Sequence, residues 1–528
     1  MKFFNRLFLI ACSIFSLSIV SCIESDEMTF EEIEKIALES WMEINRPDLL
    51  ANYQTEGGYY VELIDEGHPD SLPVRSKDAW VWFDVTCRDL AGNVVLTRNS
   101  ELARMQNSYT EHTHYVPFYL FVGGEAAAIP EGTRMSMRNK LRIGSEVYEA
   151  RYGTKMRLYL PSSIGAGDKT MGGEAGYEGQ YILDANRPMI VDIKVWGGVA
   201  NPVAYEDQWV KSFAKANGGL APLPEDKGDA ASKRRSFMRT RADEPTVYDN
   251  KWHLAVDSIA GLYVNYLYSP EQTLNFNCLG SDTLIYEGQT EYKAGKVYGT
   301  KSLAEINRLV DEVLLKRFGK GLNPADAEPL DSVDDAKIWY VTRLLDGFIV
   351  DSNIPEVKRL VYDDVPTDEV GEALEFDTSK DSEDNKYVDA WIYGVPQMKL
   401  GAWNAILTTS SNAYGATGVS GSVSSTGTTW EDNYWDYYNY YNYYNSYYGN
   451  NYYNNYYNNY YGGYGGYGGY GYGGYYNNYY DSYYYNNYYN NSYYGSSTEE
   501  EEPEMVVTSE IQPYSPLLWQ IFIEKADK

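Results

Sequence analysis

Residues 430–495 constrain the fold of this chain most, because they consist almost entirely of tyrosine, asparagine and glycine. This composition cannot build an aliphatic core, and its glycine and asparagine residues make ordering entropically expensive. Tyrosine stacking is the main interaction that such a segment offers, and the glutamates at 499–502 would keep it soluble. We expect residues 420–508 to be a disordered low-complexity insertion between folded parts of the chain. It can serve as an arm that captures unfolded protein or glycan, or it can be a tolerated expansion of a surface loop.

The chain is acidic and long. Its 528 residues include 44 Lys and Arg against 75 Asp and Glu, which gives a formal net charge of −31. Nucleic-acid binding needs clustered basic charge, so we expect no nucleic acid as a partner. The charge also disfavours docking through a basic patch on anionic lipid. The length exceeds one ordinary core and predicts two or three domains.

The N-terminus predicts export and a lipid anchor. Lys2 and Arg6 precede an apolar stretch at 7–20 that is shorter than a membrane span. Residues 19–22 (IVSC) resemble a bacterial lipobox, which implies that the thiol of Cys22 receives the lipid. The alternative is an ordinary cleaved signal with an incidental cysteine.

The resemblance divides the N-terminal part into a signal peptide at 1–21 and a tether with a helix at 22–50. The acidic residues 24–27 resemble the export tag of Bacteroidetes surface lipoproteins. We therefore expect a lipid-anchored protein of the cell envelope, in the periplasmic or the surface leaflet of the outer membrane.

The remaining cysteines and the histidines predict no metal site. Cys87 and Cys278 can pair in an oxidising envelope or remain as two buried thiols. His112 and His114 would share one face of a strand without further ligands. Nucleophile-elbow, phosphate-loop and zinc-spacing motifs are missing from the sequence, so we expect no cofactor.

Hydrophobic spacing predicts a helix and then two regions of strands. Residues 29–50 predict a helix closed by Pro47, with apolar residues at helical spacing: Phe30, Ile33, Ile36, Ala37 and Trp41. Residues 57–195 alternate as strands do. Residues 58–63 (GYYVEL) resemble 261–267 (GLYVNYL), which suggests two copies of one fold.

Three further segments complete the division of the chain. Residues 201–247 are interpreted as a linker, because 216–247 show no hydrophobic period. A capping box at 302–305 predicts a helix through Phe318 that ends at Gly319. The predicted domains are therefore 51–200 and 248–528, the second with insertions at 270–335 and 420–508.

Four segments of the C-terminal region resemble, in order, the FKBP-type peptidyl-prolyl cis-trans isomerases. They are 340–352 (YVTRLLDGFIVDS), 388–401 (VDAWIYGVPQMKLG), 412–418 (NAYGATG) and 511–524 (IQPYSPLLWQIFIE). The resemblance implies an α+β fold in which an antiparallel twisted sheet wraps around a short helix. It also implies proline-containing unfolded or exported polypeptides as substrates.

Carried onto these segments, the resemblance implies a proline pocket. Trp391 would form its floor, Tyr414 would donate its hydroxyl to the substrate carbonyl, and Asp351 would polarise the rim. The implied walls are Tyr340, Val350, Val388, Ile511 and Trp519. Rotation about an X–Pro bond passes a twisted amide with a barrier of roughly 18–20 kcal/mol, and no nucleophile or metal is required. An apolar pocket that strips water and hydrogen-bonds the twisted state is sufficient.

Departures from the family's usual residues leave a second class of function open. Val350 and Trp519 each stand where the family usually has phenylalanine. A non-catalytic surface or structural lipoprotein on the same scaffold is therefore the alternative to an envelope foldase. The set Tyr340, Asp351, Trp391 and Tyr414 favours the foldase.

The N-terminal copy resembles the family less closely. Its predicted hairpin turns at Ala91-Gly92, and residues 160–167 (LPSSIGAG) match the loop that carries the family's tyrosine. At the positions of the second copy's Tyr340, Asp351, Tyr414 and Trp519 it has Val85, Leu96, Ala166 and Val191. We expect a degenerate FKBP-like domain without catalytic activity, used for dimerisation, spacing or chaperone-like binding.

Overall fold

The computed structural model describes residues 29–75, 80–109, 111–123, 129–172, 181–222, 249–256, 259–276, 297–298, 301–330, 335–362, 371–377, 387–419 and 509–524. Cys22, Cys278 and the tyrosine-rich insertion therefore lie outside the described residues. In the part that is described, no helix is both long and apolar enough to cross a membrane.

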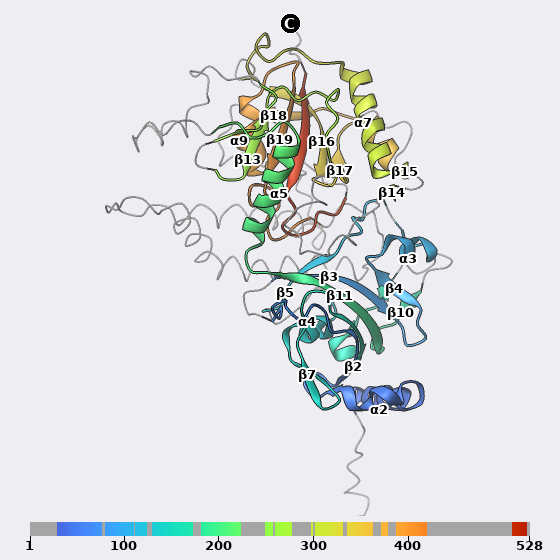
Figure 1. Cartoon of the computed structure of the whole chain (residues 1–528). Helices are drawn as coiled ribbons and strands as arrows, with labels where there is room; N and C mark the ends of the chain where they lie inside the picture. Colours follow the sequence, from blue (N-terminus) through green and yellow to red (C-terminus); the bar gives the residue numbers. More distant parts are fainter. Residues whose placement is uncertain are drawn as a thin grey trace, which may run out of the picture.

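Two antiparallel sheets, which lie in the upper and lower parts of Figure 1, repeat one strand order. The first runs β1 (Tyr53–Gln54), β2 (Tyr59–Asp65), β8 (Lys155–Leu160), β11 (Met189–Val199), β3 (Trp80–Arg88) and β4 (Val94–Thr97), with β5 (Phe118–Phe121) paired to β3. The second runs β12 (His253–Leu254), β13 (Leu262–Asn265), β19 (Trp403–Thr408), β20 (Leu517–Ile523), β16 (Asp335–Leu344) and β17 (Ile349–Ser352), with β18 (Leu374–Asp377) paired to β16. The shared order agrees with two copies of one fold.

Short helices and small hairpins complete the α+β fold and confirm the predicted class. The helices are α2 (Phe30–Asn45), α3 (Ser100–Met105), α4 (Glu131–Arg138), α5 (Pro202–Ala216), α7 (Leu303–Phe318), α8 (Pro355–Val361) and α9 (Asp389–Gly394). Short 3-10 helices are η2 (Pro47–Asn52), η3 (Ser162–Ile164), η8 (Val395–Gln397) and η9 (Ser410–Asn412). The hairpins pair β6 (Leu141–Ile143) with β7 (Glu146–Tyr148), β9 (Met171–Gly172) with β10 (Ile182–Leu183), and β14 (Val297–Tyr298) with β15 (Lys301–Ser302).

The pairing registers of the two sheets correspond residue by residue. Equivalent pairs are Val85–Ile193 and Tyr340–Ile521, Cys87–Leu96 and Thr342–Asp351, and Leu158–Val191 and Ile406–Trp519. The replacements that were predicted for three strand positions of the first copy are therefore confirmed.

Both domains turn at the same point after the strand that carries these residues. Gly92 and Gly347 have φ of +91° and +90°, a region in which a side chain is strained. At Gly347 a Cβ would also lie 2.8 Å from Asn307 and 2.9 Å from Phe276. The predicted glycine hairpins are confirmed.

The predicted helix after the capping box is α7, and it shows what part of the 270–335 insertion does. It ends at Phe318, and Gly319 follows with a φ of +70°. Ile306, Val310 and Leu314 recur every four residues and join the core of the second domain.

Helix α2 was predicted correctly, but of the five predicted apolar residues only Trp41 packs, at 5.7 Å from Tyr159 between ring centroids. Its N-terminus has the capping box of Thr29 and Glu32, and the chain continues after Pro47 as η2. Phe30, Ile33 and Ile36 are 55, 52 and 50% exposed. The buried face consists of Glu34, Leu38 and Met42. Leu38 and Met42 pack on the outer face of the first sheet, against Tyr60, Tyr159 and Ile190.

The interpretation of residues 201–247 as a linker is wrong for its first part, which forms α5. Asn201 caps this helix through a 3.0 Å bond from the backbone amide of Ala204. Three of its side chains are buried against the outer face of the second sheet: Val210, Phe213 and Ala214 pack with Tyr263, Leu407 and Leu518. Figure 1 shows α5 lying along the strands of this sheet. Helices α2 and α5 are therefore the same element of two repeating units.

This arrangement predicts that a C-terminal fragment needs α5. A fragment of residues 249–528 exposes the apolar surface that Val210 and Phe213 cover, which costs on the order of 3–6 kcal/mol. We expect urea denaturation to give a lower free energy of unfolding for 249–528 than for 201–528. A 201–528 fragment with Lys215→Ala, a change at an exposed position of α5, serves as the control. Equal stability of the two fragments would contradict the assignment of α5 to the second domain.

Candidate functional site

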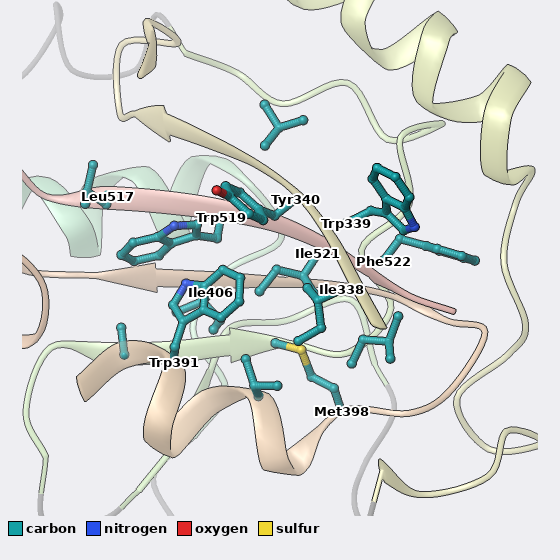
Figure 2. Close-up of a cluster of buried hydrophobic side chains, with 14 of the residues drawn as sticks. Ile338, Trp339, Tyr340, Trp391, Met398, Ile406, Leu517, Trp519, Ile521 and Phe522 are labelled. Carbon is teal, nitrogen blue, oxygen red and sulfur yellow. The ribbon is translucent and has the colours of Figure 1, made fainter. Parts of the chain in front are cut away.

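Four of the predicted site residues meet at the inner face of the second sheet. Tyr340 comes from β16, Asp351 from β17, Trp519 from β20 and Trp391 from α9, and all are buried. In Figure 2 the indole of Trp391 rises from α9 toward the strands that carry Tyr340 and Trp519. Tyr340 is directly paired with Ile521, and Trp519 lies two residues before Ile521 on β20. Residues two apart on a strand point to the same face, so Tyr340 and Trp519 share the inner face of the sheet.

A buried hydrogen bond joins two of these residues. The Tyr340 hydroxyl donates to Oδ2 of Asp351 over 2.6 Å, and the two residues are 4% and 2% exposed. Burial, with a further contribution from the Asp351 carboxylate, raises the pKa of Tyr340 well above its usual value. The phenol therefore stays protonated and holds the carboxylate in one orientation.

Trp391 is the centre of an aromatic cluster. Its ring meets Tyr340 edge-on at 5.3 Å and Trp519 edge-on at 6.5 Å between centroids. Both indole Nε1 atoms are buried and have no hydrogen-bond acceptor among the described residues. The cluster thus combines closely packed ring faces with two buried N–H donors that the described residues leave without an acceptor.

Two further aromatic residues of this cluster were missed by sequence reasoning. Tyr387 stacks on Trp391 at 5.8 Å, and Phe376 stacks on Tyr387 at 5.0 Å. The Tyr387 hydroxyl donates to the backbone oxygen of Glu375 over 2.7 Å. Tyr387 could have been predicted from its position in the sequence, directly before the segment 388–401.

The aliphatic wall residues lie in the same buried cluster. Val350 is buried, Val388 is half-buried, and Ile511 forms a two-bond bridge with Val419. Residues 363–370, 378–386 and 420–508, which continue the chain from the site, lie outside the described residues.

Tyr414 is half-buried and packs against this cluster from a tightly held turn. The backbone oxygen of Ser410 accepts from the amides of Ala413 and Gly415, both at 2.8 Å. The backbone oxygen of Tyr414 accepts from Gly418 at 3.0 Å. These bonds fix the backbone on both sides of the tyrosine.

A carboxyl group from α5 holds the start of this turn. Ser410 donates from its amide to Glu206 Oε2 at 3.0 Å and from its hydroxyl to Oε1 at 2.6 Å. Burial raises the pKa of Glu206 to about 8, although the bonds from Ser410 oppose the shift. No sequence pattern indicated this role, because Ser410 lies far along the chain from the helix.

The hydrogen bonds from Ser410 to Glu206 form a clamp on the turn, and the first domain has an equivalent clamp on a turn that presents a different residue. Glu34 of α2 accepts from the amide and the hydroxyl of Ser162 at 2.5 and 2.6 Å. The Ser162 oxygen accepts from Gly165 and Gly167, both at 2.9 Å, so Ala166 occupies the place of Tyr414. The turn is therefore conserved between the two copies, whereas the hydroxyl is not.

The first domain also differs on the inner face of its sheet. Val85, Leu96 and Val191 carry neither a hydroxyl nor a carboxylate. Helix α4, which precedes β8 as α9 precedes β19, contains no aromatic residue. The pair of buried polar groups found in the second domain has no counterpart at these positions.

The histidines and cysteines of the described residues form no metal site. No group of three His, Cys, Asp or Glu side chains in the described part of the chain could hold a metal ion. His112 stacks on Tyr362 at 4.2 Å, and His114 lies 3.0 Å from the Asp346 carboxylate. Cys87 is a free buried thiol.

Comparisons with known proteins were positive only for solved structures. No family model matches the chain, and no curated protein does. FkpA from Escherichia coli is 12% identical, covering 37% of this chain and 71% of that one, with a TM-score of 0.20. The three FKBP domains of wheat FKBP73 are 9% identical over 89% of this chain and 95% of that one, with a TM-score of 0.18. A peptidyl-prolyl cis-trans isomerase of Pseudomonas syringae pv. tomato is 14% identical over 32% and 94%, with a TM-score of 0.21.

The clamp on the turn of Tyr414 predicts a pH dependence of stability. The folded state holds a proton on Glu206 up to pH of about 8, whereas the unfolded chain loses it near pH 4.5. Stability contributed by this group is therefore complete below pH 4.5 and declines as pH rises to 8, by on the order of 3–5 kcal/mol. In Glu206→Gln the amide replaces the protonated carboxyl, so we expect similar stability at pH 5 and higher stability than wild type at pH 9. Urea denaturation across this range tests it, with Glu312→Gln at an exposed position of α7 as the control. A wild-type pH slope in Glu206→Gln would contradict the role of burial.

Proposed function

We propose that this chain is a peptidyl-prolyl cis-trans isomerase of the FKBP type that assists the folding of exported proteins. The observation that carries the proposal is the buried Tyr340–Asp351 pair beside Trp391, in a domain whose four sequence segments resemble that family in order. The site lies in the second domain.

The chemistry of isomerisation fits such a site. The barrier of roughly 18–20 kcal/mol comes from the resonance of the amide, so a surface that favours the twisted amide over the planar one accelerates rotation. The faces of Trp391 and Trp519 are apolar and suit a proline ring. Donors near the substrate carbonyl, among them the Tyr414 hydroxyl, would stabilise the twisted state without any covalent step.

Asp351 acts in this proposal through its fixed orientation. Its side chain is buried and one of its oxygen atoms accepts from Tyr340. A carboxylate held in a low-dielectric setting exerts a stronger field on a nearby dipole than one in water. The substrate amide is such a dipole.

A binding protein without turnover is the second candidate. Val350 is a smaller wall than an aromatic residue, and the first domain has already lost the hydroxyl and the carboxylate. This candidate predicts that the chain binds proline-containing peptides without accelerating their isomerisation.

The proposed location is the cell envelope, with the chain anchored through a lipid on Cys22. The basic start, the apolar stretch of 7–20 and the lipobox-like residues 19–22 support it. Proline-containing unfolded or exported polypeptides are the proposed substrates.

A protease-coupled assay of cis-to-trans conversion on the full mature chain tests the activity. We expect acceleration in the wild type and a loss of about tenfold or more in Tyr414→Phe combined with Asp351→Asn, because the donor and the carboxylate are both removed. The asparagine oxygen still accepts from Tyr340, so the fold should persist.

Tyr148→Phe in β7, where the hydroxyl donates to Glu146 on the surface, is the matched control and should keep full activity. Full activity of the double variant would rule out the assigned residues. Peptide binding without acceleration in the wild type would favour the binding protein.

The anchor is tested separately by metabolic labelling with palmitate in a bacterial host. We expect labelled protein in the membrane fraction from the wild type and none from Cys22→Ser, because the thiol is the acceptor. The matched control is Cys12→Ser, which changes a cysteine within the predicted signal. Undiminished labelling of Cys22→Ser would contradict the anchor.

A further inference from the structure

The first domain contacts the second beside the candidate site through Trp80 of β3 and mainly through a segment of residues 98–121. It begins at Arg98, directly after β4, and ends with β5. It meets the second domain at residues 509–514, which precede β20 and contain the wall residue Ile511. The contact therefore lies beside the site.

Arg98 is the central residue of this contact. Its guanidinium donates to both carboxylate oxygens of Glu510 at 2.9 and 3.0 Å, and the side chains are 5% and 8% exposed. It also donates to the backbone oxygens of His114 at 2.7 Å and Val116 at 3.3 Å. A buried bidentate pair of this kind gives both strength and geometric specificity.

Residues 509–511 are held from both domains at once. The Ser509 amide donates to the Val350 oxygen at 2.9 Å, and the Glu510 amide donates to the His112 oxygen at 3.1 Å. Ile511 exchanges two backbone bonds with Val419. Ser509 and Ile511 thus have their partners in the second domain, whereas Glu510 has its partners in the first.

Aromatic contacts extend the same interface on both sides. Tyr514, whose φ of +55° is unfavourable for a residue with a side chain, packs edge-on against Trp80 at 4.8 Å, and its amide donates to Gly415 at 2.9 Å. His112 stacks on Tyr362, whose hydroxyl lies 2.8 Å from the Ser509 hydroxyl. The packing against the first domain keeps Tyr514 in this conformation, next to the turn of Tyr414.

We propose that the first domain is a brace for the site of the second, and that Arg98 is a positioning residue that acts through Glu510 on the wall residue Ile511. This inference rests on the proposed function for its effect on catalysis, but the brace itself is a property of the two domains. It gives the degenerate domain a role other than dimerisation, spacing or chaperone-like binding.

The test uses the full mature chain with Arg98→Met and Arg98→Lys, and with Arg157→Met as a matched control. Arg157 pairs with Asp192 at 2.6 Å within the first sheet, away from the interface. Hydrogen–deuterium exchange of peptides that cover 509–511 reports the position of the segment, and the isomerase assay gives KM and kcat separately.

In Arg98→Met we expect exchange at 509–511 to be at least tenfold faster and KM to rise about tenfold with kcat changed less than twofold. Arg98→Lys keeps the charge without the fork, and we expect about a threefold change in each quantity. If Arg98→Met fails to fold, the exchange rate and KM of Arg98→Lys provide the test. Arg157→Met should match the wild type.

Unchanged exchange would overturn the brace, and faster exchange with unchanged KM would overturn the positioning role. A wild-type chain without isomerase activity would instead refute the proposed function. In that case the exchange comparison still decides whether Arg98 holds residues 509–511.

Discussion

The second domain depends on the pairing of β20 between β19 and β16. This strand supplies Trp519 to the aromatic cluster and Ile521 to the core, yet it begins at Leu517, far beyond Thr408 at the end of β19. The entropic cost of closing a long loop grows only slowly with its length, so the sheet can form across the insertion. Its register needs local anchors, and these are the bonds of residues 509–511 together with the packing of Tyr514.

The two domains share a framework but differ in the residues that it presents. Each begins with a helix whose buried glutamate accepts from the amide and hydroxyl of one serine: Glu34 with Ser162, and Glu206 with Ser410. A carboxyl group placed so deeply is costly unless it is hydrogen-bonded, so the serine and the glutamate stabilise each other's position. What differs is the residue presented by the clamped turn, and this difference separates a supporting domain from one with a candidate site.

Local patterns in the sequence were sufficient for much of this fold. Alternation and glycine turns predicted the strands and hairpins, and the equivalence of Val85 with Tyr340 and of Leu96 with Asp351 could be predicted from repeated motifs. Helix α5 could also have been predicted, from the Asn201 cap and its apolar spacing. The serine clamps and the Arg98–Glu510 pair could not, because each joins residues that are remote in the chain and ordinary in type. The packed face of α2 was missed because its exposed face is also apolar.

The bridge between Val419 and Ile511 has a consequence for how this protein can change over time. Their two backbone bonds, of 2.7 and 2.9 Å, bring the chain back to the point at which residues 420–508 depart. Repeats of a low-complexity segment can be gained or lost there without shifting a strand or opening the core. The second domain can therefore tolerate a change in the length of residues 420–508, because the bridge keeps the two flanks of the insertion together whatever their separation along the chain.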